Sequence, residues 1–333
     1  PEVLLPALMH TGLAERHEVR LFVAAELSAW LEDACGRFGL PLAGHGPGAG
    51  LRLNPVADAT AQVRPTPGRP SAASREQAFR ALSAMADAAA SGELDVMITG
   101  PVPKSIFDHV SPRPPGQTEF LAARLKAPRH AMMLAGPRLR VVPVTTHVPL
   151  REVAHLLTTQ SIVDAGLATA DALARWFGIA APRLAVCGLN PHAGEEGRVG
   201  DEEARIIAPA VLELVRAGID AEGPVVADCV FHRAMAGRYD AVLCMYHDQA
   251  LGPLKTVHFH DACNLTCGLP VPRISPDHGT AYDIAGQGVA DATSMIQALQ
   301  RAEQMALVQV SQRVAPLGGR EDRKSTRLNS SHT

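Results

Sequence analysis

The stretch RLAVCGLNPHAGEEGRVGDEE, residues 183–203, shows the local pattern on which the fold rests. Arg183–Cys187 is a short apolar run, typical of a buried strand. A glycine-rich turn with His192 follows. The acidic run after Gly200 is typical of the first turn of a helix, where carboxylates favour the positive end of the dipole. The flanking glycines offer the ring of His192 little to pack against, so we expect this ring to face a ligand.

The same succession of strand and helix recurs along the chain. Several expected strands are continuous apolar runs, which are typical of parallel strands buried on both faces. Strand–helix alternation predicts an α/β fold with a mainly parallel sheet, and ligands of such sheets bind at the carboxyl ends of the strands. The expected strands are Arg20–Ala25, Asp95–Thr99, His130–Leu134, Arg140–Thr145, Arg183–Cys187, Ala241–Met245 and Asn264–Cys267, with one more short strand in the Gly- and Pro-rich region 44–70.

Three long helices are expected between the strands. Ser74–Gly92 is alanine-rich, and Ser74 is its expected N-cap. Ser161–Phe177 and Asp291–Val310 carry apolar side chains at helical spacing, which predicts one buried stripe on each helix. The polar tail 321–333 has no apolar period that could dock it, so we expect it to be disordered or foreign to the gene.

Composition excludes several classes of function. The 333 residues are 47% hydrophobic and 20% charged, and the formal net charge is −3. Such a chain has no basic field for nucleic acid or for an anionic membrane, and no apolar run is long enough to span a bilayer. Its six cysteines form no CxxC pair, which is the cysteine usage of a reducing cytoplasm with buried thiols.

Three histidines share one kind of position. His147, His192 and His247 each come just after an apolar strand, beside small or turn-forming residues. Neutral imidazole is the commonest transition-metal ligand, so three strand ends that meet at one edge could hold a divalent ion. Each histidine could equally be a hydrogen-bonding loop residue. Their common placement favours the metal interpretation.

A second group of residues suits an anionic ligand. Lys255, Asn264 and Arg273 follow one another at intervals of nine, and Gln117 and Thr118 stand at an expected helix start. A lysine, an amide and an arginine fork could hold a phosphate or carboxylate, as could the free N–H groups of a helix terminus. By spacing alone, the two cations could also be surface charges and the helix start an ordinary one.

The glycine-rich segment DHGTAYDIAGQGVAD, Asp277–Asp291, is a third candidate, because its backbone could approach a ligand closely. Gly286 and Gly288 form a GxG, but the surrounding sequence lacks the dinucleotide-binding fingerprint of a Rossmann fold. A Walker loop and a GxSxG elbow are also absent from the sequence, which argues against P-loop NTPases and α/β-hydrolases.

Together these stretches resemble the 4-hydroxythreonine-4-phosphate dehydrogenases of pyridoxal phosphate biosynthesis. The resemblance runs from about residue 98 to 292, in the order of the family. It rests on ITGPVPKSIF, GQTEFLA, TTHVPLREV, CGLNPHAGEEGRVGDEE, YHDQALGPLK and NLTCGLPVPRISPDHGTAYDIAGQGVADA.

The resemblance implies an isocitrate/isopropylmalate dehydrogenase-like fold of two α/β/α subdomains with a cleft between them. Residues 1–320 would form one two-lobed unit, with lobes of approximately 1–120 plus 255–320 and 121–254. The family forms a homodimer with a shared active site. It oxidises 4-hydroxy-L-threonine 4-phosphate with NAD (possibly NADP) and a divalent ion (Zn, Mg, Mn or Co).

The resemblance also assigns roles to residues. The implied metal ligands are His147, His192 and His247, the implied substrate contacts are Thr118, Lys255, Asn264 and Arg273, and the implied cofactor contacts are His278, Gly279 and Asp283. We expect Gln117, directly before Thr118, to join the substrate contacts. An acidic residue in the cleft of the family matches Asp228, and from their positions we expect Asp228 and Lys255 to transfer protons.

Two departures from the family matter. Most members have a histidine where Gln117 stands, and Gln cannot carry a charge or shuttle protons. This keeps open a related dehydrogenase that acts on a 4-phosphorylated sugar acid or an aromatic cis-diol carboxylate. The family also begins with a strand and a glycine-rich loop that are missing ahead of Glu2, which keeps open a non-catalytic metal- or phosphate-binding protein.

Overall fold

The computed structural model describes residues 2–40, 42, 49–56 and 66–314, so the expected tail 321–333 and most of the region 44–70 lie outside the described residues. The elements are α1 Leu4–Thr11, α2 Leu13–Arg16, β1 Glu18–Ala24, η1 Ala25–Leu27, α3 Ser28–Arg37, β2 Gly50–Val56, α4 Ala72–Ala90, β3 Met97–Ile98, η2 Lys104–Phe107, α5 Gln117–Arg124, β4 Ala131–Ala135, β5 Arg140–Thr145, η3 Leu150–Glu152, α6 Val153–Leu156, α7 Thr159–Phe177, β6 Arg183–Cys187, η4 Pro191–Gly197, the π-helical turn η5 Glu203–Ile207, α8 Ala208–Arg216, β7 Asp220–Val225, α9 Ala227–Met235, β8 Ala241–Tyr246, α10 His247–Val257, β9 Cys263–Cys267, β10 Arg273–Pro276 and α11 Thr293–Val314.

The described strands form one sheet in the order β3-β10-β9-β4-β5-β8-β6-β7 and a separate parallel pair, β1 and β2. Pairing is parallel except between β10 and β9, β9 and β4, and β4 and β5. Short hairpin connections impose two of these exceptions, because only antiparallel neighbours can be joined by a tight turn. The α/β class with a mainly parallel sheet is confirmed.

Two strands of the large sheet were not expected from the sequence. β7 contains Gly223 and Pro224, which weaken a strand pattern and are tolerated because β7 lies at the edge of the sheet. β10 is only four residues long and begins with Arg273, although all four residues are buried. The seven strands that the sequence predicted are all present, with ends shifted by at most two residues.

The helix starts differ slightly from those expected. The N-cap of α4 is Ser71 and not Ser74, because Ser71 and Ser74 form a reciprocal capping box in which Ser74 is the third helical residue. Helix α7 begins at Thr159, with Thr158 in the same kind of box. Its predicted apolar stripe is buried, and Trp176 is 1% exposed.

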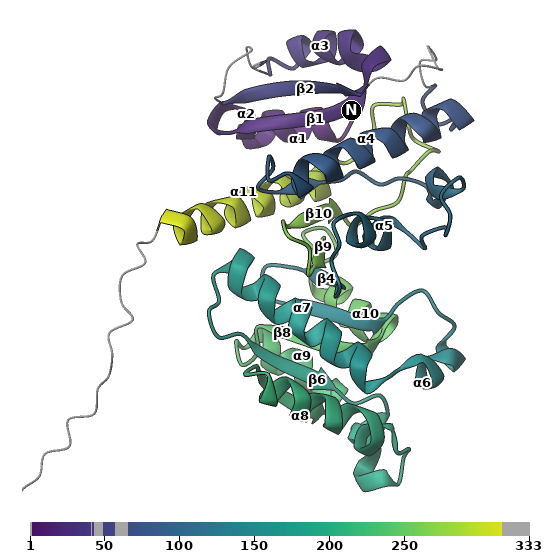
Figure 1. The fold of residues 1–333 in the computed structure, drawn as a ribbon, viewed down its shortest axis with the longest axis vertical. Helices are drawn as coiled ribbons and strands as arrows, with labels where there is room; N and C mark the ends of the chain where they lie inside the picture. Colours follow the sequence, from purple (N-terminus) through teal and green to yellow (C-terminus); the bar gives the residue numbers. More distant parts are fainter. Residues whose placement is uncertain (1, 41, 43–48, 57–65, 315–333) are drawn as a thin grey trace, which may run out of the picture.

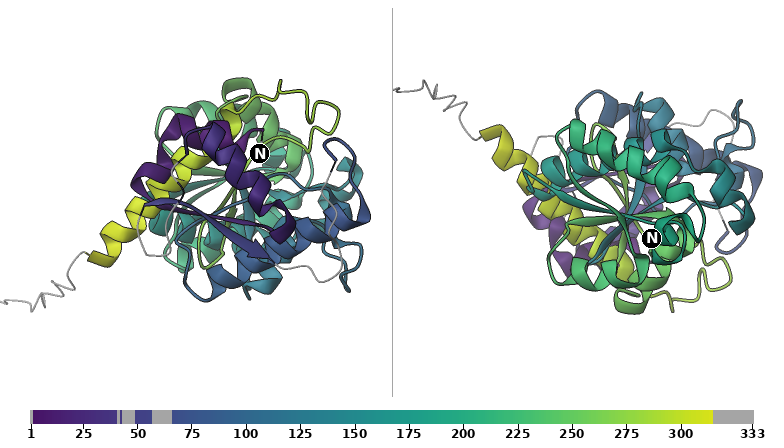
Figure 2. Two further views of the ribbon diagram at one scale, coloured as in Figure 1. Left: turned by 90° about the horizontal axis from the view of Figure 1, so that it is seen from above. Right: turned by 90° about the horizontal axis from the view of Figure 1, so that it is seen from below.

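Helices cover both faces of the large sheet (Figures 1 and 2). On one face α7, α8 and α11 share a core with the strands, and on the other face α9 and α10 do so. The pair β1–β2 lies at one end of the molecule with α1 and α3 on either side (Figure 1). In the sheet order, β3, β10 and β9 stand together at one end and the strands of residues 121–254 follow, with β9 paired to β4. The division into lobes and the cleft between them stay predictions.

Candidate active site

His147 and His247 follow neighbouring parallel strands. β5 and β8 pair in register up to Thr145 and Tyr246. His147 lies two residues beyond β5, and His247 is the first residue of α10. Their ring centroids are 5.8 Å apart. Two imidazoles that share a tetrahedral ion have centroids about 5 Å apart, given metal–nitrogen bonds of about 2.1 Å. These two rings are therefore spaced to face one common ion.

The surroundings of His147 favour its neutral form. Burial lowers the pKa of His147, and the nearby charges of Lys104 and His247 lower it further, whereas Glu119 opposes them. Neutral imidazole is the form that binds a metal. Nδ1 of His247 lies 2.7 Å from Oδ1 of Asp248. A carboxylate on one ring nitrogen orients the ring and leaves Nε2 for a ligand.

His192 lies in a left-handed turn. All residues from His192 to Gly197 have positive φ, including four that are not glycine. For such residues the left-handed conformation costs about 1–2 kcal/mol each. His192 is exposed, and among the residues with described placement no three potential ligands come together around one ion. One chain thus presents two of the three predicted histidines as a pair and holds the third apart.

Glu203 holds this turn. It stands in the first turn of the following helical segment, as expected for the acidic run, and its side chain also reaches back to the glycine-rich turn. Its carboxylate is 5% exposed. It accepts hydrogen bonds from the backbone N–H of Asn190 at 2.7 Å and from Nδ2 of Asn190 at 3.0 Å. A Cβ at Gly194 would come within 2.7 Å of Glu203 Oε2. The carboxylate therefore fills the centre of the turn and offsets its backbone strain.

Arg273 is the main cation of the anion-binding candidate. Its side chain is 4% exposed. Its guanidinium donates to Thr99 Oγ1 at 2.9 Å, to Thr266 Oγ1 at 3.3 Å and to Gln117 Oε1 at 3.0 Å. All three partners are neutral. Burial lowers the pKa of Arg273 to about 10, while Glu119 raises it. A buried charge with only neutral hydrogen-bond partners suits an incoming anion.

Arg273 and the histidine pair lie at the same edge of the sheet. β4 runs antiparallel to β5, so its amino end lies at the carboxyl edge of β5. The carboxyl end of β9 pairs with that end of β4, and Arg273 pairs with Thr266 of β9. The influence of Glu119 on both His147 and Arg273 agrees with this placement.

Gln117 and Thr118 begin α5, as predicted. Nε2 of Gln117 donates to the carbonyl of Gly100 at 3.2 Å while its Oε1 accepts from Arg273. Gln117 thus holds the guanidinium of Arg273 in place. Asn264, in β9, has a buried Oδ1 without a hydrogen-bond partner in the described part of the protein.

Lys255 lies farther along the same face. It is eight residues after His247 on α10, a rise of about 12 Å. Its ammonium group forms an ion pair with Asp277, four residues after Arg273 and so about 13 Å along an extended strand. The rise along α10 from His247 to Lys255 and the length of chain from Arg273 to Asp277 are therefore nearly equal. The predicted anion group is therefore spread along β10 rather than gathered at one point.

The remaining predicted residues are exposed. Asp228 is near the start of α9 and accepts a hydrogen bond from the Cys229 thiol at 2.8 Å. His278, Gly279 and Asp283 lie in the segment 277–292, and Nδ1 of His278 is 2.9 Å from the carbonyl oxygen of Gly279. All six cysteines are free, and all but Cys229 are buried, which agrees with the expected buried thiols.

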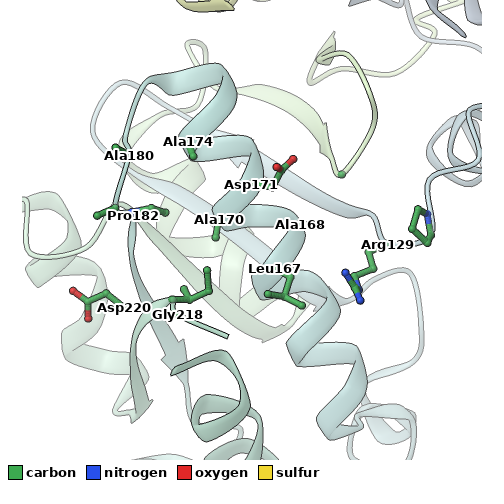
Figure 3. Close-up of a pocket in the computed structure, with 14 residues that line it drawn as sticks. Arg129, Leu167, Ala168, Ala170, Asp171, Ala174, Ala180, Pro182, Gly218 and Asp220 are labelled. Carbon is green, nitrogen blue, oxygen red and sulfur yellow. The ribbon is translucent and has the colours of Figure 1, made fainter. Parts of the chain in front are cut away.

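A groove of about 560 Å³ lies elsewhere, along α7 (Figure 3). Alanines of α7 line it, together with Arg129, Asp171, Pro182 and Asp220, and none of the predicted site residues does. In the described part of the chain, no helix combines the length and hydropathy needed to cross a membrane.

Several residues of the site were not singled out as site residues from the sequence. A signal existed for Thr99, Lys104, Glu203, Thr266 and Asp277, because each stands inside a segment that resembles the family. Only the tertiary structure shows that Thr99 and Thr266 contact Arg273 and that Lys104 lies near His147.

A family model described as pyridoxal phosphate biosynthetic protein PdxA matches residues 42–302. The chain belongs to the PdxA family. One relative, 4-hydroxythreonine-4-phosphate dehydrogenase from Bradyrhizobium diazoefficiens, is 49% identical over 257 residues, which cover 76% of this chain and 74% of the relative. The enzyme of that name from Xanthobacter autotrophicus is 42% identical over 319 residues, with 92% and 91% covered.

Solved structures give the same result for the PdxA fold. A 4-hydroxythreonine-4-phosphate dehydrogenase from Burkholderia phymatum is 34% identical, with a TM-score of 0.77 over 91% of this chain and 93% of that one. A terephthalate 1,2-cis-dihydrodiol dehydrogenase from Burkholderia xenovorans is 27% identical, with a TM-score of 0.67 over 93% and 95%. This PdxA-family chain is an oxidoreductase, since its relatives are dehydrogenases.

Proposed function

We propose that the protein oxidises 4-hydroxy-L-threonine 4-phosphate with NAD and a divalent metal ion. The product, 2-amino-3-oxo-4-phosphooxybutanoate, would lose carbon dioxide to give 3-amino-2-oxopropyl phosphate. The observation that carries this proposal is the buried Arg273, which has neutral hydrogen-bond partners and lies at the same sheet edge as the histidine pair. The names of the PdxA relatives supply the substrate.

Arg273 would bind an anionic group of the substrate. The guanidinium is already desolvated, so an arriving phosphate or carboxylate gains a charge-assisted contact and removes no bound water from it. Asn264 Oδ1 would accept a hydrogen bond from a hydroxyl or ammonium group of the substrate, and Thr118 would add the N–H groups at the start of α5 for the anion. Lys255 would give up its ion pair with Asp277 and bind the phosphate of the substrate instead.

The histidines would hold the metal ion. Their chemistry and the spacing of His147 and His247 fit a zinc-, cobalt-, manganese- or magnesium-like ion, but one chain brings only two of them together. We propose that the active form is a homodimer in which residues of a second copy complete each site. A bound ion would supply Lewis-acid chemistry that lowers the pKa of the substrate hydroxyl.

The other residues would move protons and hold the cofactor. Asp228 and Lys255 are the candidates for proton transfer. A dehydrogenase implies a nicotinamide cofactor in general, and we assign His278, Gly279 and Asp283 to its adenosine half. The choice of NAD over NADP is part of the proposal.

A related substrate is the second candidate. Gln117 stands where most of the family has histidine, and its oxygen is committed to Arg273. It cannot give a ligand the positive charge of a protonated histidine. An aromatic cis-diol carboxylate carries no phosphate and would need less positive charge at this point, and a neighbour of the diol class shares the fold. A 4-phosphorylated sugar acid is the other alternative substrate.

One assay separates these possibilities. NADH absorbance is followed with 4-hydroxythreonine 4-phosphate, a panel of sugar-acid phosphates and a cis-dihydrodiol carboxylate, each with and without added metal. We expect the first substrate to give the highest kcat/KM. A higher kcat/KM with another substrate would move the assignment to the alternative, and no NADH with any of them would leave a non-catalytic binding protein.

A further inference from the structure

Phe259 presents an exposed aromatic ring beside the proposed cofactor segment. The side chain is 66% exposed, in a chain with only 4% aromatic residues. It lies in the connection between α10 and β9. Nζ of Lys255 is 5.3 Å from its ring centroid, and the ring of His260 packs edge-on at 5.0 Å. The ring is thus held in place by a cation and a second ring, although much of it faces solvent.

Both ends of the segment 277–291 come close to these neighbours of Phe259. Asp277 forms the ion pair with Lys255. Hydrogen bonds from Thr293 lower the pKa of Asp291, and the nearby charges of His260 and His278 lower it further. The segment therefore begins beside Lys255 and ends beside His260, and both of these residues contact the exposed ring.

The position of Phe259 agrees with one end of an extended dinucleotide. Lys255, which contacts the ring, is about 12 Å along α10 from His247, where the substrate hydroxyl is proposed to react. An extended dinucleotide can span this separation. With the nicotinamide near the histidine edge, its adenine would therefore reach the surroundings of Phe259.

We propose that Phe259 stacks on the adenine ring of the nicotinamide cofactor. This inference rests on the proposed NAD dependence. Adenine would lie on the exposed face of the ring, with His260 at its edge. The cofactor diphosphate would lie beside His278. Every base has a π-face that stacks on an aromatic side chain, so the contact contributes affinity for the adenosine half.

The test compares Phe259→Leu and Phe259→Trp with the wild-type protein by titration calorimetry with NAD, AMP and nicotinamide mononucleotide. We expect Phe259→Leu to weaken NAD and AMP alike by about tenfold, since base–aromatic stacking contributes 1–3 kcal/mol. Phe259→Trp should keep the affinities for NAD and AMP near the wild-type values, because tryptophan also stacks on adenine. The affinity for nicotinamide mononucleotide should stay unchanged. Phe38→Leu is the matched control, because Phe38 is also exposed.

Three outcomes would overturn the inference. One is unchanged affinity for NAD and AMP in Phe259→Leu. Another is a loss for NAD and nicotinamide mononucleotide but not for AMP, which would place the nicotinamide on Phe259. The third is an altered oligomeric state in Phe259→Leu, measured by light scattering, which would make the ring part of a subunit contact. Failure of the wild-type protein to reduce NAD would instead refute the proposed function.

Discussion

Replacing Arg273 with methionine should leave the unliganded protein at least as stable as it is and abolish its response to phosphate. Burial holds the pKa of Arg273 at about 10, well below its ordinary value. A change of one in pKa corresponds to about 1.4 kcal/mol, so keeping the guanidinium charged costs on the order of 3 kcal/mol. Methionine fills a similar volume without this cost.

The gain is reduced by the loss of the three hydrogen bonds that Arg273 donates. Gln117 Oε1 would lose the Arg273 donor, and an unsatisfied buried acceptor costs about 1–3 kcal/mol. The two hydroxyls of Thr99 and Thr266 can turn to other partners. The expected change in the free energy of unfolding therefore lies between zero and a gain of about 2 kcal/mol.

The assay is urea unfolding of both proteins, with and without inorganic phosphate. A ligand at a hundred times its Kd adds about 2.7 kcal/mol to the free energy of unfolding, and Arg273→Met should lack this increment. Arg140→Met is the control. Arg140 is half-buried, donates to the carbonyl of Asp240 and lies over the Phe177 ring. Its loss should destabilise the protein and leave the phosphate increment intact.

Two results would refute this reasoning. A loss of 3–5 kcal/mol in Arg273→Met is what breaking a compensated buried pair gives, so it would mean that the charge already has a counter-ion. An unchanged phosphate increment in the variant would mean that another cation binds the anion.

Three further predictions follow from the structure. His192→Ala should reduce activity to near background and release the bound metal, and metal analysis with both retained would exclude His192 as a ligand. Glu203→Ala should open the strained turn, so trypsin should cleave after Arg198 sooner than in the wild type; equal cleavage rates would remove Glu203 as the brace. Burial raises the pKa of Asp240, but the hydrogen bonds from Arg183 outweigh burial and lower this pKa. The ionised carboxylate of Asp240 therefore stabilises the protein above the unfolded-state pKa of about 3.9, and this stabilisation is lost as the pH falls below that value. Asp240→Asn should flatten the fall of Tm between pH 5 and about pH 3, and parallel curves would contradict the assignment.

Local sequence was enough to predict the elements that carry the site. The apolar runs that end at Thr145 and Cys187 became strands with those ends. Glycine and proline at β7 hid an edge strand, because edge strands tolerate residues that a strand pattern excludes. Ser74 is a residue type that can cap a helix, but Ser71 is the N-cap of α4 and Ser74 is the third helical residue of the capping box.

The sequence by itself determined the α/β class, the strand-end positions of the three histidines and the basic groups near the carboxyl end of the chain. Tertiary structure decided which of these meet. It set His147 beside His247, bound Lys255 to Asp277 and surrounded Arg273 with residues from three distant segments. The reason is that hydrophobic period and turn chemistry act over a few residues, whereas the desolvation of Arg273 arises only when β3, β9, β10 and α5 pack around it.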